Sequence, residues 1–208
     1  MTAAAQSASV IVEWGVAAHA FGGSVDCGDL HIVAPFPGGV LLGAVDGLGH
    51  GPEAAEAARL AVDVLTRHAG ERPAVLVQRC HEALRKTRGV VLSLASVDGL
   101  SRTLTWLGIG NVEGGLFRAA QAANPHRETV LLRSGVVGYQ LPALRETTLA
   151  LAGGDMLVFA TDGIRRGFGD EAVVGREPQE VAEDIVARYG KNDDDALVLV
   201  ARYLGELP

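Results

Sequence analysis

The chain has 208 residues, of which 48% are hydrophobic, and this fits one globular domain with a sizeable core. Its formal net charge is -7, and it contains no Lys/Arg-rich run. Proteins that bind nucleic acid present clustered basic side chains, so the composition excludes nucleic acid as a partner. An acidic chain can instead gather carboxylates around a cation.

The two cysteines, Cys27 and Cys80, lack the spacing of a zinc site and are too few for a secreted disulfide framework. The N-terminal residues have no basic segment followed by an apolar stretch of signal length. No segment approaches the roughly 20 apolar residues that cross a bilayer. We therefore expect a soluble, cytoplasmic protein with free thiols and no membrane association.

Apolar segments rich in Val, Ile, Leu and Thr recur along the chain, punctuated by Gly, Pro, Asn or Asp, as is typical of β-strands. The predicted strands cover residues 9–17, 30–34, 39–45, 89–97, 102–109, 114–119, 129–133, 155–161 and 196–204. Asp98-Gly99, between two of these segments, is a strong signal for a hairpin.

Three segments have helical periodicity, and each begins with a proline, which suits the first turn of a helix. The first helix is predicted over 52–69. The second begins at Pro73 and places basic residues, including Arg85 and Arg88, at its far end, where cations suit the helix dipole. The third begins at Pro178.

The order of these elements is strands, two consecutive helices, a long meander of strands, a helix and a last strand. Two adjacent helices followed by hairpin-linked strands differ from the strand–helix alternation of parallel sheets. They indicate an α+β fold in which helices pack outside antiparallel sheets. No internal repeat or linker interrupts the chain, so we expect a single domain over 1–208, with its core at about 10–204.

Acidic residues lie where predicted strands begin or end. Asp46 and Asp162 directly follow apolar strands, whereas Asp29 and the run Asp193–Asp195 directly precede them. Carboxylates that converge at one sheet edge repel one another unless a cation neutralises them, and oxygen ligands favour hard ions such as Mg²⁺ or Mn²⁺. The alternative is that each aspartate independently caps a turn through its side chain.

Four motifs, "VDCGD", "AVDGLGHG", "FATDGI" and "DDAL", occur in the order and contexts found in PPM-type, metal-dependent protein serine/threonine phosphatases. The chain resembles the SpoIIE-like bacterial branch of this family over roughly residues 10 to 204. "LRKTRGVVLSLASVD" and "LGIGNV" look most like the feedback phosphatases of the stressosome. The resemblance implies an αββα sandwich, in which two antiparallel sheets are flanked by helices.

The resemblance also implies a site with two ions, Mn²⁺ or Mg²⁺, between the sheets at one end of the sandwich. Asp46 would bridge both ions, and the Gly47 carbonyl would complete the ligands of the first. Asp162 and Asp194 would hold the second ion. Asp29 resembles the acidic residue that contacts metal-bound water, so Asp46 and Asp29 are the predicted catalytic residues.

The implied reaction is hydrolysis of phosphoserine or phosphothreonine by a water molecule that the two ions activate, without a covalent intermediate. The implied substrate is a phosphorylated regulatory protein, such as a stressosome component, and the expected oligomeric state is a monomer. No activated Cys or Ser nucleophile stands out in the sequence, which agrees with direct attack by water.

The chain also departs from the family pattern. Leu48 occupies the place where many members carry a histidine, and His50 lies nearby at a different spacing. No arginine precedes the first acidic motif to hold the substrate phosphate, although Arg165 and Arg166 are candidate replacements. The family's threonine after the last acidic motif is Leu197. The adjacent Asp193, Asp194 and Asp195 leave the register of that motif open.

Two other functions remain open at this point. The loss of the usual histidine and arginine suits a catalytically weak pseudophosphatase that acts as a binding module. The glycine-rich "GLGHG" turn before the first helix resembles turns that bind nucleotide phosphates. The P-loop lysine motif and the alternation of a parallel sheet are both absent from the sequence, which argues against that second reading.

Overall fold

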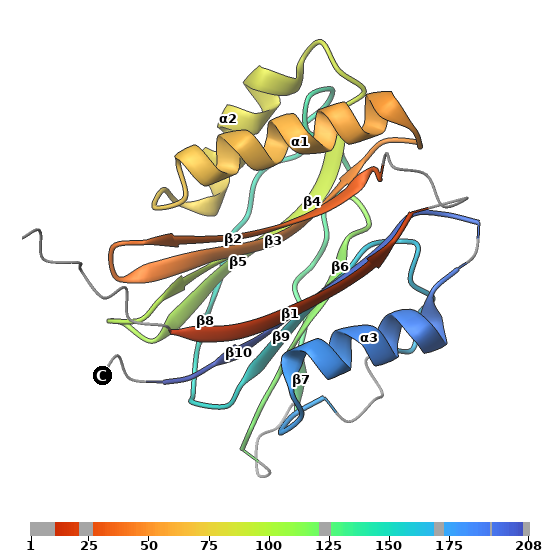
Figure 1. Ribbon diagram of the computed structural model, residues 1–208. Coiled ribbons are helices and arrows are strands. Elements are labelled where there is room, and N and C mark those ends of the chain that lie inside the picture. The colour runs from red at the N-terminus through yellow and green to blue at the C-terminus, as the bar shows by residue number, and fades with distance from the viewer. Residues whose placement is uncertain (1–10, 21–26, 121–125, 169–172, 192, 206–208) are drawn as a thin grey trace, which may run out of the picture.

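The computed structural model describes residues 11–20, 27–120, 126–168, 173–191 and 193–205. In this part of the chain, two five-stranded antiparallel sheets lie face to face, and helices cover their outer faces (Figure 1). The predicted α+β class and αββα sandwich are confirmed.

The strand orders explain which chain segments meet. The first sheet has the order β1, β10, β9, β6, β7, with bounds Val12–His19, Ala196–Tyr203, Met156–Ala160, Glu113–Phe117 and Arg127–Glu128. The second has the order β2, β3, β4, β5, β8, with bounds Asp29–Phe36, Gly39–Gly47, Val90–Asp98, Thr103–Ile109 and Thr147–Ala150. Consecutive strands build most of the second sheet, whereas the first joins strands from both ends of the chain.

The helices are α1 (Pro52–Arg67), α2 (Pro73–Leu84) and α3 (Pro178–Tyr189), and each begins at the predicted proline. Helices α1 and α2 cover the second sheet, and α3 covers the first (Figure 1). The sequence had suggested that the basic residues Arg85 and Arg88 lie at the far end of α2. The helix instead ends at Leu84, so both residues follow it. None of these described helices is long and apolar enough to cross a membrane.

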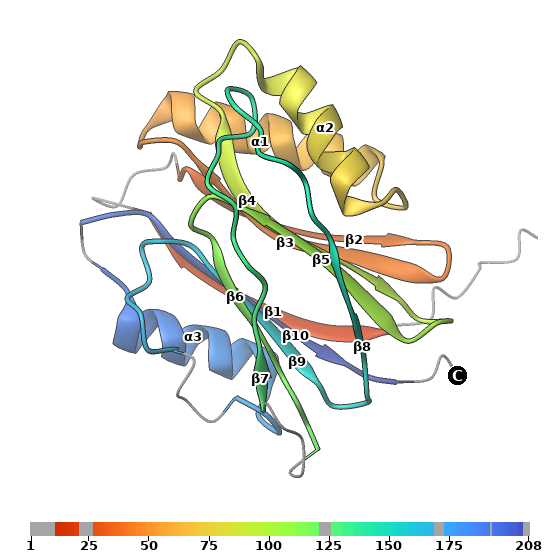
Figure 2. The ribbon, with the colours of Figure 1, turned by 180° about the vertical axis from the view of Figure 1, so that it is seen from behind.

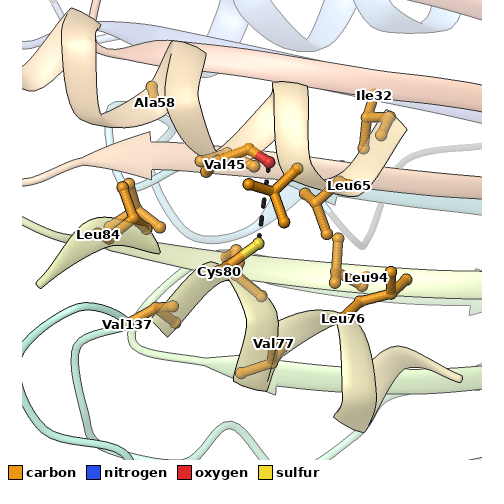
Figure 3. Packing of buried hydrophobic residues seen from close by; sticks show 14 of the residues in the cluster. Ile32, Val45, Ala58, Leu65, Leu76, Val77, Cys80, Leu84, Leu94 and Val137 are labelled. Carbon is orange, nitrogen blue, oxygen red and sulfur yellow. Dashed lines mark hydrogen bonds between the residues drawn. The ribbon is translucent and has the colours of Figure 1, made fainter. Parts of the chain in front are cut away.

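Three apolar layers hold the sandwich together. Between the sheets, the Trp106 and Phe159 rings meet edge to face with centroids 5.3 Å apart. Figure 3 shows part of the layer between the second sheet and its helices, where the Cys80 sulfur lies 3.8 Å from the Ala61 carbonyl oxygen. Burial raises the pKa of this thiol to about 12, so Cys80 acts as an apolar core residue. A third layer packs α3 against the first sheet.

The segment between β7 and β8 differs from the sequence-based prediction. Residues 129–133 were predicted as a strand, but only Arg133 forms a single bridge, to Ile109, and Leu131 is 74% exposed. The chain uses this segment to cross from the first sheet to the second (Figure 2). The edge strand β8, which the sequence analysis missed, pairs with β5 through mostly exposed residues and so lacks an apolar pattern.

Candidate metal centre

The predicted acidic residues come from both sheets and share one end of the sandwich. Asp29 begins β2 and is the direct register partner of Asp46 near the end of β3. Asp162 follows β9, and the aspartate run 193–195 precedes β10, the antiparallel neighbour of β9. The alternation of strand direction therefore brings these ends together, at the right of the sandwich in Figure 1.

Hydrogen bonds across the two sheets fix the inner part of this site. The Thr161 hydroxyl, at the end of β9, donates to Asp29 Oδ2 over 2.6 Å. The Gly28 amide, next to β2, donates to Asp195 Oδ2 over 2.7 Å. Asp29 and Asp195 are only 4% and 5% exposed. Both side chains therefore lie inside the sandwich, where they lock the two sheets together.

The other carboxylates face an open cavity of about 720 Å³. Its acidic lining residues are Asp46, Asp162, Asp193 and Asp194. The fold thus separates three aspartates that the sequence could not distinguish: Asp193 and Asp194 line the cavity, whereas Asp195 caps the Gly28 amide. Of the two that line the cavity, Asp193 is exposed and Asp194 is partly buried.

Asp162 is held by two neighbours that the sequence analysis did not assign to the site. The Asn111 side-chain amide donates to Asp162 Oδ2 over 2.7 Å, and the Lys191 ammonium donates to the Asp162 main-chain carbonyl over 2.6 Å. Asn111 follows β5 within the "LGIGNV" segment and also lines the cavity. The sequence signals for its role were its place in that motif and its position two residues after a buried strand.

Gly47 permits a close approach of the β3 end to α1. A Cβ atom at this position would lie 2.2 Å from the Ala54 carbonyl oxygen, so every other residue would push the helix away. Gly47 has no positive φ, unlike Gly49 and Gly51 in the following turn, so its role is space and not an unusual backbone conformation. His50, from the same turn, lies at the exposed rim and lines the cavity.

The surroundings of these carboxyl groups favour their protonated, uncharged form. Burial and then repulsion from Asp29, Asp162 and other aspartates raise the pKa of Asp46 to about 9. Burial, opposed by the Thr161 hydrogen bond and reinforced by Asp195, raises the pKa of Asp29 to about 7. Burial and the charge of Asp162 also raise the pKa of Asp194.

This donor set fits a hard divalent cation in chemistry and charge. The carboxyl donors are all oxygens, and a bound cation would offset the burial and the repulsion that raise these pKa values. As placed, no three Asp, Glu, His or Cys side chains in the described ranges lie close enough together to hold an ion. Binding would therefore draw the cavity-facing carboxylates inward against their mutual repulsion.

The raised pKa values predict how the stability of the metal-free protein depends on pH. In the folded chain, the pKa values of Asp29 and Asp46 are about 7 and about 9, above the ordinary aspartate value. At pH values between that ordinary value and the raised ones, the folded chain therefore binds more protons than the unfolded chain does. The free energy of unfolding should therefore fall as pH rises from about 4 towards 9.

Urea unfolding in EDTA, followed by circular dichroism across this pH range, measures the effect. Asp46→Asn should flatten the decline, because it removes the group with the larger pKa shift. A decline of equal slope in the variant and the parent chain would contradict the electrostatic origin assigned to it.

Comparison with known proteins identifies the family. The family model for Stage II sporulation protein E (SpoIIE) matches residues 37–204. Phosphoserine phosphatase RsbX of Bacillus subtilis (strain 168) is 28% identical over 86 residues, which are 41% of this chain and 43% of that protein. The match thus spans less than half the length of this curated relative.

Solved structures agree over a longer span. A chain from a study of the bacterial stressosome, described as a modular system adapted to control secondary messenger signaling, has a TM-score of 0.82 and 30% identity, covering 92% of this chain and 99% of that one. RsbX in complex with magnesium has a TM-score of 0.81 at 20% identity, covering 92% and 95%, which supports the fold. The chain therefore belongs to the SpoIIE family of PPM-type phosphatase domains.

Proposed function

We propose that this chain is a metal-dependent protein serine/threonine phosphatase. The observation that carries the proposal is the gathering of Asp46, Asp162 and Asp194 from both sheets around one open cavity, with raised pKa values at Asp46 and Asp194. Active sites commonly concentrate such perturbed groups in a cleft. The named relative RsbX, a phosphoserine phosphatase, supports the reaction class.

The proposed ligands are those that the family resemblance implies. Asp46, the Gly47 carbonyl, Asp162 and Asp194 would hold two ions, Mn²⁺ or Mg²⁺, and Asp29 would orient a water molecule bound to them. When bound, such ions lower the pKa of water and neutralise charge on a phosphoryl group. A related chain, RsbX, has been solved in complex with magnesium, which supports the choice of ion.

The chain's own residues would position the reaction. Asn111 donates to one oxygen of Asp162, which would leave the other oxygen available to an ion. The Thr161 hydroxyl fixes Oδ2 of Asp29, which leaves Oδ1 to accept a hydrogen bond from water. The Leu197 amide in turn donates to the Thr161 oxygen over 2.8 Å, so the hydroxyl proton points at Asp29. Leu197, the departure from the family's threonine, thus acts through its backbone.

We further propose that the substrate is a phosphoserine or phosphothreonine on a regulatory partner protein, in a stressosome-type stress-response pathway. The support is the likeness to a chain studied in the stressosome and to RsbX. The open cavity admits a side chain presented by a folded partner. We propose a cytoplasmic, monomeric single domain that contacts neither membrane nor nucleic acid, in line with its formal net charge of -7.

Turnover of p-nitrophenyl phosphate and of a phosphoserine peptide tests the proposal. We expect hydrolysis in millimolar Mn²⁺ or Mg²⁺, loss of activity in EDTA and recovery when metal is returned. The inorganic phosphate released from either substrate can also be measured directly, which gives a readout that does not depend on p-nitrophenol absorbance. A well-folded protein that turns over neither substrate with either metal would instead be a pseudophosphatase that binds its partner.

A further inference from the structure

A second cavity, of about 320 Å³, adjoins the metal-site cavity, and we refer to it as the side cavity. Asn111 and Asp162 line both cavities and form the wall between them. Arg165, Arg166 and Lys191 line the side cavity but not the metal-site cavity. The two arginines therefore lie next to the metal site, on the far side of the shared wall.

The side cavity differs from the metal-site cavity in charge. The metal-site cavity is lined by four aspartates. The side cavity is lined by three cations, Arg165, Arg166 and Lys191, and by two acidic residues, Glu113 and Asp162. In a chain with a formal net charge of -7, this local excess of positive charge favours an anionic ligand.

The floor of the side cavity is apolar. Ile164 and Phe168 line it, and they are only 6% and 2% exposed. The guanidinium carbon of Arg127 lies 5.4 Å from the centre of the Phe168 ring, which adds positive charge close to this floor. Apolar walls with a few placed polar groups are typical of sites that bind a small group. This combination suits a short acidic side chain, with methylene groups against the floor and a carboxylate at the arginines.

The two arginines have donors to offer such a carboxylate. Arg165 Nη2 donates to the Arg188 carbonyl over 2.7 Å, and this neutral acceptor leaves the guanidinium charge in place. Arg166 Nε lies 3.5 Å from Glu113 Oε1, beyond ordinary hydrogen-bond distance, and its side chain is 93% exposed. A guanidinium group carries five N–H donors, so each arginine can bind a carboxylate while keeping its present neighbour.

The backbone fixes the arginines relative to the metal site. The Arg165 amide donates to the Tyr189 carbonyl, and the Lys191 amide donates to the Gly163 carbonyl, both over 2.8 Å. A Cβ atom at Gly163 would lie 1.9 Å from the Asp195 carbonyl oxygen, so this turn packs tightly against the aspartate run. The fold therefore sets the separation between the two cavities, as a site that reads neighbouring substrate residues requires.

We infer that the side cavity binds an aspartate or glutamate of the substrate segment, close in sequence to the phosphorylated residue. The inference rests on the proposed function, in which the phosphoryl group occupies the metal-site cavity. A polypeptide that crosses the shared wall at Asn111 and Asp162 presents its next side chains to the side cavity. The carboxylate accepts hydrogen bonds from Arg165 and Arg166, so the enzyme selects phosphoserines that lie in acidic segments.

Two phosphoserine peptides test this selection, one with glutamates on both sides of the phosphoserine and one with glutamines at the same positions. In Mn²⁺, the parent chain should have a kcat/KM about fivefold higher for the glutamate peptide, mainly through KM, and high salt should reduce this preference. Arg165→Gln and Arg166→Gln should each bring the ratio of the two kcat/KM values close to one.

Arg67→Gln is the matched control, because the Arg67 side chain is 65% exposed on α1 and lies 3.9 Å from Asp63. This variant should keep the preference of the parent chain. Equal kcat/KM values for the two peptides in the parent chain would overturn the inference. So would arginine variants that lose activity equally on both peptides, because the arginines would then act on the phosphoserine itself.

Binding of the unphosphorylated peptides to the Mg²⁺-loaded protein, followed by amide NMR, separates this inference from the proposed function. Shifts of the Arg165, Arg166 and Lys191 amides with the glutamate peptide, and not with the glutamine peptide, support the inference even if no phosphoester is hydrolysed. If these amides respond equally to both peptides, or to neither, the inference is wrong. Hydrolysis of both phosphopeptides would then show that the phosphatase function still stands.

Discussion

Asp46→Asn is expected to lower phosphatase activity by several orders of magnitude while leaving the fold intact. The amide keeps the shape of the side chain but cannot supply the negative charge that two cations would share. Asp46 also lies near the end of a buried strand, directly opposite Asp29, so the fold fixes its position. Steady-state hydrolysis of a phosphoserine peptide in saturating Mn²⁺ measures the loss, and circular dichroism checks the fold.

His50→Ala supplies the comparison for this measurement. His50 lines the same cavity but lies at its exposed rim, so its removal should lower kcat about tenfold or less. Near-normal turnover by Asp46→Asn would refute the assignment of Asp46 as the bridging ligand. A His50→Ala loss as large as that of Asp46→Asn would show that the histidine, and not the metal site alone, supplies essential chemistry.

The burial of Asp46 beside other carboxylates should also lower the stability of the folded, metal-free chain. Its pKa of about 9 reflects burial beside other carboxylates, which the folded chain tolerates only by keeping protons on this group. In EDTA above neutral pH, Asp46→Asn should therefore be at least as stable as the parent chain. A variant that gains stability as it loses activity indicates that the charge is kept for function.

The positions of the acidic residues could be predicted from the sequence because apolar runs stop abruptly at them. Asp29 begins one buried strand and Asp46 lies near the end of the next, and antiparallel pairing makes them register partners. Antiparallel sheets with outer helices followed from the order of the apolar segments, and the family resemblance implied the two-sheet sandwich. In contrast, β8 was missed because its exposed edge position leaves no apolar pattern in its sequence.

The finer details of the site depend on contacts between distant segments. Asp194 and Asp195 are equivalent in the sequence, but the Gly28 amide, next to the other sheet, binds Asp195, whereas Asp194 lines the cavity. Asn111 gains its role because β5 ends beside Asp162.

Mn²⁺ is expected to raise the melting temperature of the chain by roughly 5 to 10 °C, a prediction that needs no substrate. A metal that binds only the folded protein contributes about 2.7 kcal/mol when its free concentration is a hundredfold above its dissociation constant. For a domain of this size, each kcal/mol corresponds to a shift of roughly 2 to 4 °C. The folded chain should bind metal far better than the unfolded chain, because only folding brings Asp46, Asp162 and Asp194 to one cavity.

Matched variants assign this thermal shift to the site. Asp46→Asn should remove most of the Mn²⁺ effect, whereas Asp63→Asn should keep it, because the Asp63 side chain is 70% exposed on α1 and pairs with Arg67. Ca²⁺ should also stabilise the parent chain, since it tolerates looser oxygen geometry than Mg²⁺ does. If neither Mn²⁺ nor Mg²⁺ at millimolar concentration changes the melting temperature, the aspartates cap turns independently. The placement of Asp46, Asp162 and Asp194 around one cavity argues against that outcome, because independent caps would have no reason to share it.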